Sequence, residues 1–207
     1  MRGRFITIEG GEGAGKSTMI DRISDWLAQA GYRVVTTREP GGTDLAEKLR
    51  EILLDRQNVS LSSKAELMLM FAARAQHLAE LIWPALLRGE TVLCDRFTDA
   101  TWAYQGGGRQ LPRQDIAVLE QLVHGDLQPD LTLLLDLPVE QGLRRASDRG
   151  EADRFEQESL EFFERVRAAY LERARSAPQR FAVIDASKNV EEVWSQIESV
   201  LQEQIWQ

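Results

Sequence analysis

The sequence has a single cysteine and no long apolar run, and each of these absences excludes a class of protein. Because Cys94 stands alone, an internal disulfide and a metal site built from several cysteines are both excluded. No stretch approaches the roughly 18–20 apolar residues that are needed to span a bilayer. The first residues lead into "FITIEGGEG" without an apolar secretory segment. We therefore expect a cytoplasmic protein that does not bind membranes.

The chain also lacks an excess of basic residues. Its 33 acidic residues outnumber its 25 lysines and arginines, which gives a net charge of −8. A broad nucleic-acid surface needs clustered Lys and Arg, so this balance argues against a nucleic-acid partner but still permits a local anion pocket. The 207 residues are 43% hydrophobic and 28% charged, which is typical of one globular domain over residues 1–207.

Short apolar runs alternate with helical patterns along the whole chain. Because the apolar runs are continuous rather than alternating, they favour an α/β fold in which helices cover both faces of a parallel sheet. Ligands of such sheets bind at the carboxyl ends of the strands. The runs interpreted as strands cover residues 5–8, 34–37, 91–97, 131–137 and 181–186. The predicted helices cover about residues 16–30, 43–54, 63–84, 116–122, 160–175 and 193–201, with one more after Pro138. Ser63 and Glu66 have the spacing of a capping box and are expected to begin the helix at residue 63.

The segment "GGEGAGKST" carries the strongest single motif. Gly10, Gly15, Lys16 and Ser17 fit the phosphate-binding pattern G-x-x-x-x-G-K-[ST], and they lie between a predicted strand and a predicted helix. The glycines allow backbone N–H groups to face phosphate oxygens, and the helix directs its positive end at the same place. Lys16 is expected to contact the β- and γ-phosphates, and Ser17 to ligate Mg²⁺. The predicted ATP-binding residues are Gly10, Gly11, Glu12, Gly13, Ala14, Gly15, Lys16, Ser17 and Thr18.

Three further motifs supply the parts of a second nucleotide site. They are "TREPGGT" at residues 37–43, "MFAARAQH" at residues 70–77 and "DRFTDATWAYQGGGR" at residues 95–109. Aromatic rings can stack on a base, and arginines can donate to a base oxygen or hold a monophosphate in bidentate fashion. The candidates are Phe71 and Tyr104 for stacking, Arg74 for the base oxygen, and Arg38 and Arg96 for the phosphate.

Several of these features have plainer alternatives. The phosphate motif can be a glycine-rich turn with a helix-capping lysine, and Arg38 can form a surface ion pair with Glu39. Phe71, at helical spacing, can belong to the core, and the glycines at 106–108 can form either a flexible loop or a loop that closes on a ligand. Asp95 directly follows an apolar strand, and charged residues at the carboxyl end of a parallel strand lie in the ligand crevice. A purely structural role is therefore a weaker alternative for Asp95.

With these motifs together, the chain resembles the thymidylate kinases of the bacterial type over essentially its whole length. The resemblance rests on "EGGEGAGKST", "REPGGT", "LMFAARAQH" and "DRFTDATWAYQGGGR". It implies a P-loop NTPase-like three-layer fold, with a five-stranded parallel sheet, helices on both faces and a mobile lid. It also implies the phosphorylation of dTMP to dTDP with ATP and Mg²⁺, for dTTP biosynthesis, by an enzyme that is usually a homodimer.

The resemblance also implies roles for single residues. Phe71 is similar to the residue that stacks on thymine, and Arg74 to the one that bonds its O4 atom. Arg96 resembles the ligand of the dTMP phosphate, and Arg38 the residue beside the phosphoryl path. The other matches are Thr101 and Gln105 in the base pocket, Tyr104 and Glu12 at the sugar, and Glu9 and Asp95 near the metal. The implied catalytic residues are Lys16, Arg38, Asp95 and one arginine of the lid.

The stretch "GLRRASDRGEADRFE" is rich in arginine, and we interpret about residues 142–154 as the lid. Some thymidylate kinases carry a catalytic arginine in the phosphate loop, but here the loop has none, so the resemblance implies a lid arginine. Arg149 is the first candidate, because it precedes Gly150 in a predicted loop, and Arg154 is the second. Arg144 and Arg145 are further candidates, and a solvated basic helix end is the alternative.

Two other functions stay open at this point. One is a kinase of another nucleoside monophosphate or of a deoxynucleoside, and the other is an NTP-binding switch without a second substrate. The paired arginines and stacking aromatics argue against the switch, as does the lack of the Asn-Lys-x-Asp motif with which GTPases recognise guanine. Slow hydrolysis without an acceptor would favour it. Trp206 has no role that the sequence indicates.

Overall fold

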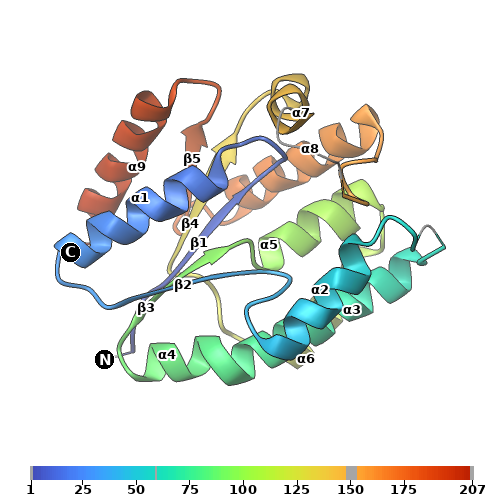
Figure 1. Ribbon diagram of the computed structural model, residues 1–207, viewed down its shortest axis with the longest axis horizontal. Helices are drawn as coiled ribbons and strands as arrows, with labels where there is room; N and C mark the ends of the chain where they lie inside the picture. Colours follow the sequence, from blue (N-terminus) through green and yellow to red (C-terminus); the bar gives the residue numbers. More distant parts are fainter. Residues whose placement is uncertain (1, 59, 148–152, 206–207) are drawn as a thin grey trace.

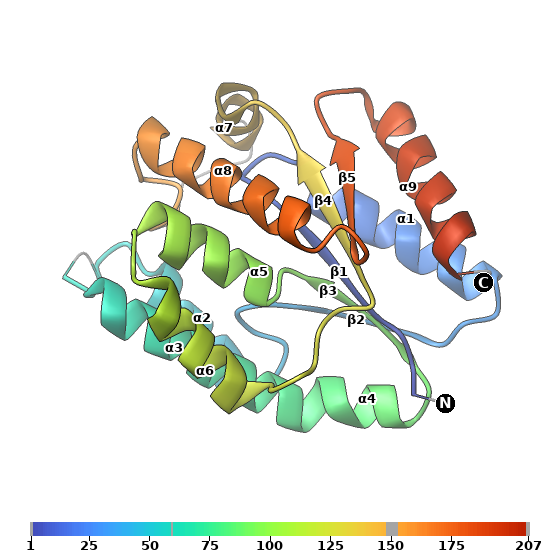
Figure 2. The same ribbon diagram turned by 180° about the vertical axis from the view of Figure 1, so that it is seen from behind.

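The computed structural model describes residues 2–58, 60–147 and 153–205, and a five-stranded sheet forms its centre (Figures 1 and 2). The strands pair in parallel in the order β2-β3-β1-β4-β5. This confirms the predicted α/β fold. Three strands end at an aspartate, one or two residues before their predicted ends. The strands are β1 (Phe5–Gly10), β2 (Val34–Arg38), β3 (Thr91–Asp95), β4 (Leu131–Asp136) and β5 (Phe181–Asp185).

Helices cover both faces of the sheet, as the continuous apolar strands predict. On one face, α1 (Lys16–Gln29) and α9 (Val190–Ile205) pack on β1 and β4. Figures 1 and 2 show α5 (Thr98–Thr101) and α8 (Leu160–Ser176) on the opposite face. The other helices described below are α2 (Asp44–Leu54), α6 (Arg113–Val123) and α7 (Val139–Ser147). Within the described ranges, no helix is long and apolar enough to cross a bilayer.

The long helix predicted over residues 63–84 consists of three consecutive segments. α3 (Ser63–His77) runs into a π-helical turn, η1 (Leu78–Ile82), and then into α4 (Trp83–Leu87). Pro84 lies near the start of α4, directly after the π-helical turn.

The predicted capping box of α3 is wrong by one residue. The Ser62 hydroxyl, not that of Ser63, accepts a hydrogen bond from the Ala65 N–H at 3.3 Å. Glu66 is buried and contacts side chains of other segments instead of the helix end.

The glycine run expected to form a loop is helical, so both loop alternatives are wrong. α5 continues into a second π-helical segment, η2 (Trp102–Gly108), which packs on α8. A Cβ atom on Gly107 would lie 2.7 Å from Cβ of Ala169 and 2.8 Å from the carbonyl oxygen of Arg165. The glycines therefore allow η2 to approach α8 closely, and this packing fixes Tyr104 and Gln105 of η2.

Two predictions concern residues outside the described ranges. They are the catalytic role of Arg149 and the open question of Trp206. Cys94 is fully buried in β3, as expected for a small apolar side chain.

Candidate active site

The loop between β1 and α1 has the backbone geometry that the phosphate-binding motif requires. Gly10, Gly13 and Gly15 have φ values of 143°, 68° and 86°, which residues with side chains rarely adopt. Because α1 begins at Lys16, its free N–H groups face the same loop. The Lys16 ammonium group donates to the carbonyl oxygen of Gly11 at 3.2 Å. Burial, followed by the charge of Arg96, lowers the pKa of Lys16.

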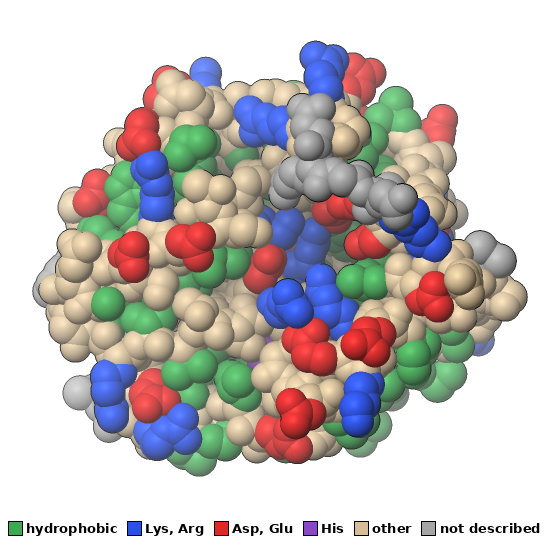
Figure 3. All heavy atoms as spheres, in the orientation of Figure 1, with side chains coloured by type: hydrophobic (Ala, Val, Ile, Leu, Met, Phe, Trp, Pro, Cys, Tyr) green, Lys and Arg blue, Asp and Glu red, His purple; other side chains and the backbone are tan. Residues whose placement is uncertain are grey.

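A cavity of about 240 Å³ opens beside this loop, and it contains most of the predicted site residues. We call it the acceptor cavity. In Figure 3, basic side chains lie inside a hollow in the middle of the face, with acidic side chains next to them. The predicted residues that line the acceptor cavity are Glu12, Gly13, Ala14, Gly15, Lys16, Ser17, Arg74, Asp95, Arg96, Thr101, Tyr104 and Gln105.

Arg96 lines the acceptor cavity and has a strained backbone. Its φ of 68° is uncommon for a residue with a side chain, and such strain is typical of functional sites. Its guanidinium group donates to Glu12 Oε1 at 2.9 Å and lies 4.8 Å from the centre of the Tyr104 ring. The Tyr104 hydroxyl donates to the same Glu12 oxygen at 2.7 Å. The fold thus brings together three residues that were predicted to contact the phosphate and the sugar.

Arg74 is buried at another part of the same cavity. Its Nε atom donates to Glu39 at 2.6 Å, and Nη2 donates to the Thr101 hydroxyl at 3.0 Å and to the Phe97 carbonyl at 3.2 Å. Among the residues that the structure describes, Nη1 has no hydrogen-bond partner. A buried donor without a partner is costly, so this nitrogen points to an acceptor supplied by a ligand.

The two carboxylates predicted near the metal have different surroundings. Asp95 lines the acceptor cavity, and its buried Oδ1 has no hydrogen-bond partner within the described ranges. Glu9 uses both oxygens, because it accepts from the Phe97 N–H and from the Tyr170 hydroxyl, each at 2.7 Å. Burial, with the charge of Asp99, raises the pKa of Glu9 to about 8. Asp95 is therefore the carboxylate with an oxygen available for a cation.

A second cavity of about 640 Å³ lies on the other side of the phosphate loop. We call it the donor cavity. Gly13, Ser17 and Thr18 line it from the loop side. The polar residues that line it from outside the phosphate motif are Arg145 from α7 and Lys188 and Asn189 from the β5–α9 connection.

The comparison with known proteins identifies the family. The thymidylate kinase family matches the sequence over residues 8–197. The chain belongs to the thymidylate kinase family. The thymidylate kinase of Pseudomonas putida is 61% identical over 201 residues, which cover 97% of this chain and 96% of that protein. The thymidylate kinase of Pseudomonas syringae pv. syringae is 59% identical with the same coverage. The crystal structure of thymidylate kinase from Ehrlichia chaffeensis aligns with a TM-score of 0.80 at 33% identity, over 98% of this chain and 100% of that one.

Some residues that the thymidylate kinase resemblance singled out lie outside the acceptor cavity. The Arg38 side chain is 54% exposed and pairs with Glu47 at 2.9 Å, so the expected pair with Glu39 is wrong. Phe71 belongs to the core with Leu67 and Ile116, as its plainer alternative held. It lies beneath the Arg74 guanidinium group, 4.8 Å from the ring centre.

The second lid candidate, Arg154, is also turned away from the acceptor cavity. It is 8% exposed, pairs with Glu66 at 2.7 Å, and donates to the Leu53 carbonyl at 2.8 Å. Glu66 also accepts from Gln105 at 2.8 Å and pairs with Arg109 at 3.2 Å. This buried carboxylate therefore connects the end of the lid to the residue predicted in the base pocket.

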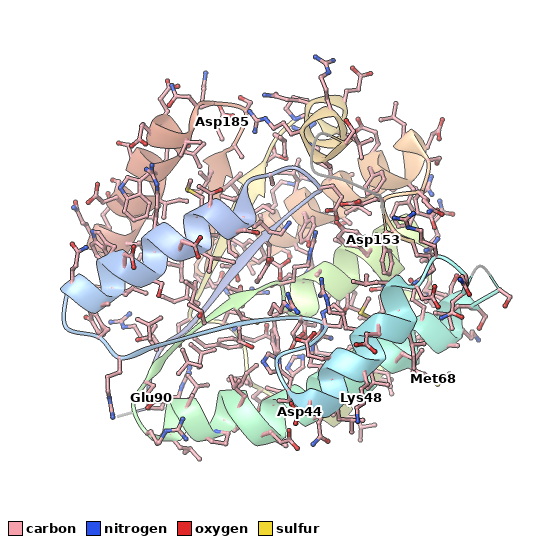
Figure 4. The ribbon with its side chains drawn as sticks, viewed as in Figure 1. Asp44, Lys48, Met68, Glu90, Asp153 and Asp185 are labelled. Carbon is pink, nitrogen blue, oxygen red and sulfur yellow. The ribbon has the colours of Figure 1, made fainter. Side chains whose placement is uncertain are left out.

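Sequence reasoning missed several residues of this thymidylate kinase site. Arg50 of α2 lines the acceptor cavity and donates to the Pro40 carbonyl at 2.8 Å. Burial, followed by the charges of Arg38 and Arg96, lowers the pKa of Arg50. Asp153, which lies inside the predicted lid and is labelled in Figure 4, and Phe155, which follows it, line the cavity as well. The only signal for Arg50 is an arginine on a helix that starts at "GGT", which is too common to identify a ligand.

Proposed function

We propose that the enzyme transfers the γ-phosphoryl group of ATP to dTMP inside the acceptor cavity, with ATP bound across the phosphate loop from the donor cavity. As a member of the thymidylate kinase family, the protein phosphorylates dTMP to dTDP, in the biosynthesis of dTTP. One observation supports the placement of the substrates most. The phosphate loop and Arg74, whose buried Nη1 atom has no partner among the described residues, line the same cavity, so one ligand can place its base near Arg74 and its phosphate near the loop.

The thymine end of dTMP would lie against Arg74. Nη1 is the only nitrogen of this guanidinium group without a partner among the described residues, so it is suited to donate to the 4-carbonyl oxygen of the base. Thr101 and Gln105 line the same part of the cavity. Phe71, as a stacking residue, would have to act from beneath Arg74 or move, and this role stays a prediction.

The sugar and phosphate of dTMP would lie between Tyr104 and the phosphate loop. Glu12 is held by both Tyr104 and Arg96, which suits a carboxylate that accepts from the sugar 3′-hydroxyl. Arg96 and Arg50 both line the cavity and carry the positive charge that a monophosphate needs. Arg38 would join them only if it released Glu47.

The nucleoside of ATP would occupy the donor cavity, with its phosphates along the glycines of the loop. The guanidinium group of Arg145 is held by the carbonyl oxygens of Ala186 at 2.9 Å and Ser187 at 3.2 Å. An arginine fixed in this way presents a flat surface on which a base can stack. Lys188 and Asn189 line the same cavity.

The residues present fit Mg²⁺, the metal that this family generally uses. Mg²⁺ prefers oxygen ligands and keeps several waters. Ser17 lines both cavities, and the buried Oδ1 of Asp95 has no partner within the described ranges, so these two residues would hold the ion, directly or through water. When bound, the ion neutralises charge on the ATP phosphates. Glu9 would contribute only by giving up a buried hydrogen bond.

The chain's own residues would then align the reactants and stabilise the moving charge. A dTMP phosphate oxygen forms the new bond to the γ-phosphorus, and the bond to the β,γ-bridging oxygen breaks, which releases ADP. Lys16 would contact the phosphoryl group in transit, and Arg96 would hold the acceptor in line. Arg149 is our first choice for the lid arginine that completes this charge, and Arg154 would have to leave Glu66 to take its place.

We also propose that the enzyme is a homodimer formed through α2, α3 and α6. These helices pack side by side and carry exposed apolar side chains. Met68 of α3 lies at the outer edge of this region in Figure 4 and is 57% exposed. Light scattering after gel filtration should give the mass of a dimer, and Met68→Glu together with Leu122→Glu should give that of a monomer. The cytoplasmic location stays a prediction.

The function is tested by the formation of ADP from ATP and Mg²⁺ with dTMP, dUMP, UMP, CMP, AMP or GMP as acceptor. A strong preference for dTMP is expected, because Arg74 offers a donor to the 4-carbonyl and Tyr104 crowds the sugar. Equally slow ADP release with every acceptor would contradict the proposal.

A further inference from the structure

A buried chain of hydrogen bonds connects the end of β2 to Arg74. The Thr37 hydroxyl lies 2.7 Å from Nε2 of His77, and Nδ1 of His77 lies 3.0 Å from Oε1 of Glu39. The other oxygen of Glu39 accepts from Nε of Arg74 at 2.6 Å. His77 is completely buried, and the side chains of Glu39 and Arg74 are each 3% exposed. Water therefore cannot take the place of His77, Glu39 or Arg74 without a rearrangement, whereas Thr37, at the end of the chain of hydrogen bonds, is half-buried.

The charges of this chain determine the direction of its hydrogen bonds. Burial alone raises the pKa of Glu39, but the charge of Arg74 and the hydrogen bond from His77 offset it, and the pKa lies below its usual value. Glu39 is thus ionised and accepts at both oxygens, so Nδ1 of His77 carries the proton that it donates. Nε2 then faces the Thr37 hydroxyl.

The second glycine of "REPGGT" provides the space for His77. Gly42 has a φ of 88°, and a Cβ atom there would lie 2.4 Å from Nε2 of His77 and 2.5 Å from the Thr37 hydroxyl oxygen. A side chain at this position would push the two groups apart. Gly42 therefore leaves room for one of the hydrogen bonds that join two motifs far apart in the sequence, "TREPGGT" and "MFAARAQH".

We propose that His77 is a positioning residue that sets which base the acceptor cavity takes. His77 fixes Glu39, and Glu39 fixes the plane of the Arg74 guanidinium group through Nε. Because Nη2 is used by Thr101 and Phe97, this plane leaves Nη1 to donate to the 4-carbonyl oxygen of a pyrimidine. The inference rests on the proposed function, since it requires that dTMP place its base against Arg74.

His77 is a better test of this arrangement than Glu39. Removal of Glu39 leaves the buried Arg74 without a counter-charge, which is strongly destabilising. Two amide substitutions of His77 separate its two hydrogen bonds. In His77→Asn the amide is bonded to Cγ, as Nδ1 is, and can still donate to Glu39. In His77→Gln the amide reaches the position of Nε2, so it can contact Thr37 but not Glu39.

The readout compares dTMP with an analogue that lacks the 4-carbonyl, the deoxyribonucleoside 5′-monophosphate of 5-methylpyrimidin-2-one. His77→Gln and His77→Ala should each lower kcat/KM for dTMP roughly tenfold, mainly through KM, because a hydrogen bond to a charged donor is misplaced. For the analogue the loss should be less than about twofold, since its base has no oxygen for Nη1. His77→Asn should recover most of the dTMP activity, and KM for ATP should not change.

The other histidine of the chain provides a matched control. His124 is also buried, and its Nε2 lies 2.8 Å from the Thr98 hydroxyl, but it does not line the acceptor cavity. His124→Ala should lower Tm and leave the dTMP-to-analogue ratio of kcat/KM unchanged.

Two results would overturn the positioning role while leaving the proposed function intact. One is an equal loss for dTMP and analogue in His77→Gln. The other is a His77→Asn variant as impaired as His77→Gln. A wild-type enzyme that does not phosphorylate dTMP would overturn the proposed function as well.

Discussion

The contact between η2 and α8 predicts different effects for two neighbouring glycines. A Cβ atom on Gly107 would meet Cβ of Ala169 at 2.7 Å and the Arg165 carbonyl at 2.8 Å, and both belong to the body of α8 and cannot turn away. Overpacking of this kind costs roughly 1–3 kcal/mol, and alanine regains roughly 0.5–1 kcal/mol over glycine in a helix. The midpoints of these ranges differ by roughly 1 kcal/mol, so we expect Gly107→Ala to be destabilised by about 1 kcal/mol, which lowers Tm by about 2–4 °C in a chain of this size.

Gly106→Ala is the matched control. Its Cβ atom would meet only the end of the Ile116 side chain, at 3.1 Å, which can rotate. In urea unfolding and in thermal unfolding of the two variants, the stability of Gly106→Ala should be close to that of the wild-type protein. Because η2 carries Tyr104 and Gln105, Gly107→Ala should also raise KM for dTMP more than KM for ATP. A Gly107→Ala variant as stable as Gly106→Ala would refute the reasoning that the glycines exist for close packing.

Three further predictions address the charges of the site. Arg149→Ala should lower turnover far more than it weakens dTMP binding. As an arginine finger, Arg149 would contribute about 10³-fold to the rate, which single-turnover kinetics would measure. Normal turnover in the variant would exclude this residue as the catalytic arginine. Arg145→Ala should raise KM for ATP several-fold and leave KM for dTMP unchanged, and a change in the dTMP constant alone would contradict the donor cavity. The pKa of Glu9 is raised from 4.5 to about 8, so the folded state favours the neutral form of this side chain. The contribution of Glu9 to stability is therefore complete below pH 4.5 and is lost as the pH rises to about 8. Glu9→Gln should remove that decline. If the urea midpoint fell by the same amount between about pH 6 and about pH 8.5 in the variant and in the wild-type protein, the prediction would be contradicted.

The fold could be predicted from sequence because its signals are local. Continuous apolar runs and helical spacing gave the parallel sheet, and the phosphate motif gave the loop at the end of β1. The errors lie where tertiary contacts decide. The glycines at 106–108 lie in a helix, and α8 leaves no room for a side chain on Gly107 or Gly108. Ser62 rather than Ser63 caps α3, a difference of one residue that spacing alone cannot resolve.

The site was predictable to the extent that its residues belong to compact motifs. Glu12, Arg96 and Tyr104 lie in two such motifs, and the structure joins them by hydrogen bonds. Arg50 lies on a surface helix with no local signal, and only the fold turns it toward the acceptor cavity. Arg38 shows the converse case: its motif is specific, but its side chain pairs with Glu47 and does not line the acceptor cavity.

The central claim is that dTMP and ATP meet at the phosphate loop, with thymine against Arg74 and the adenine base in the donor cavity. A crystal structure with dTMP and a non-hydrolysable ATP analogue tests it most directly. We predict a hydrogen bond between Nη1 of Arg74 and the 4-carbonyl oxygen of thymine, the dTMP phosphate on Arg96, and adenine beside Arg145. Thymine bound away from Arg74, with Nη1 still without a partner, would contradict it.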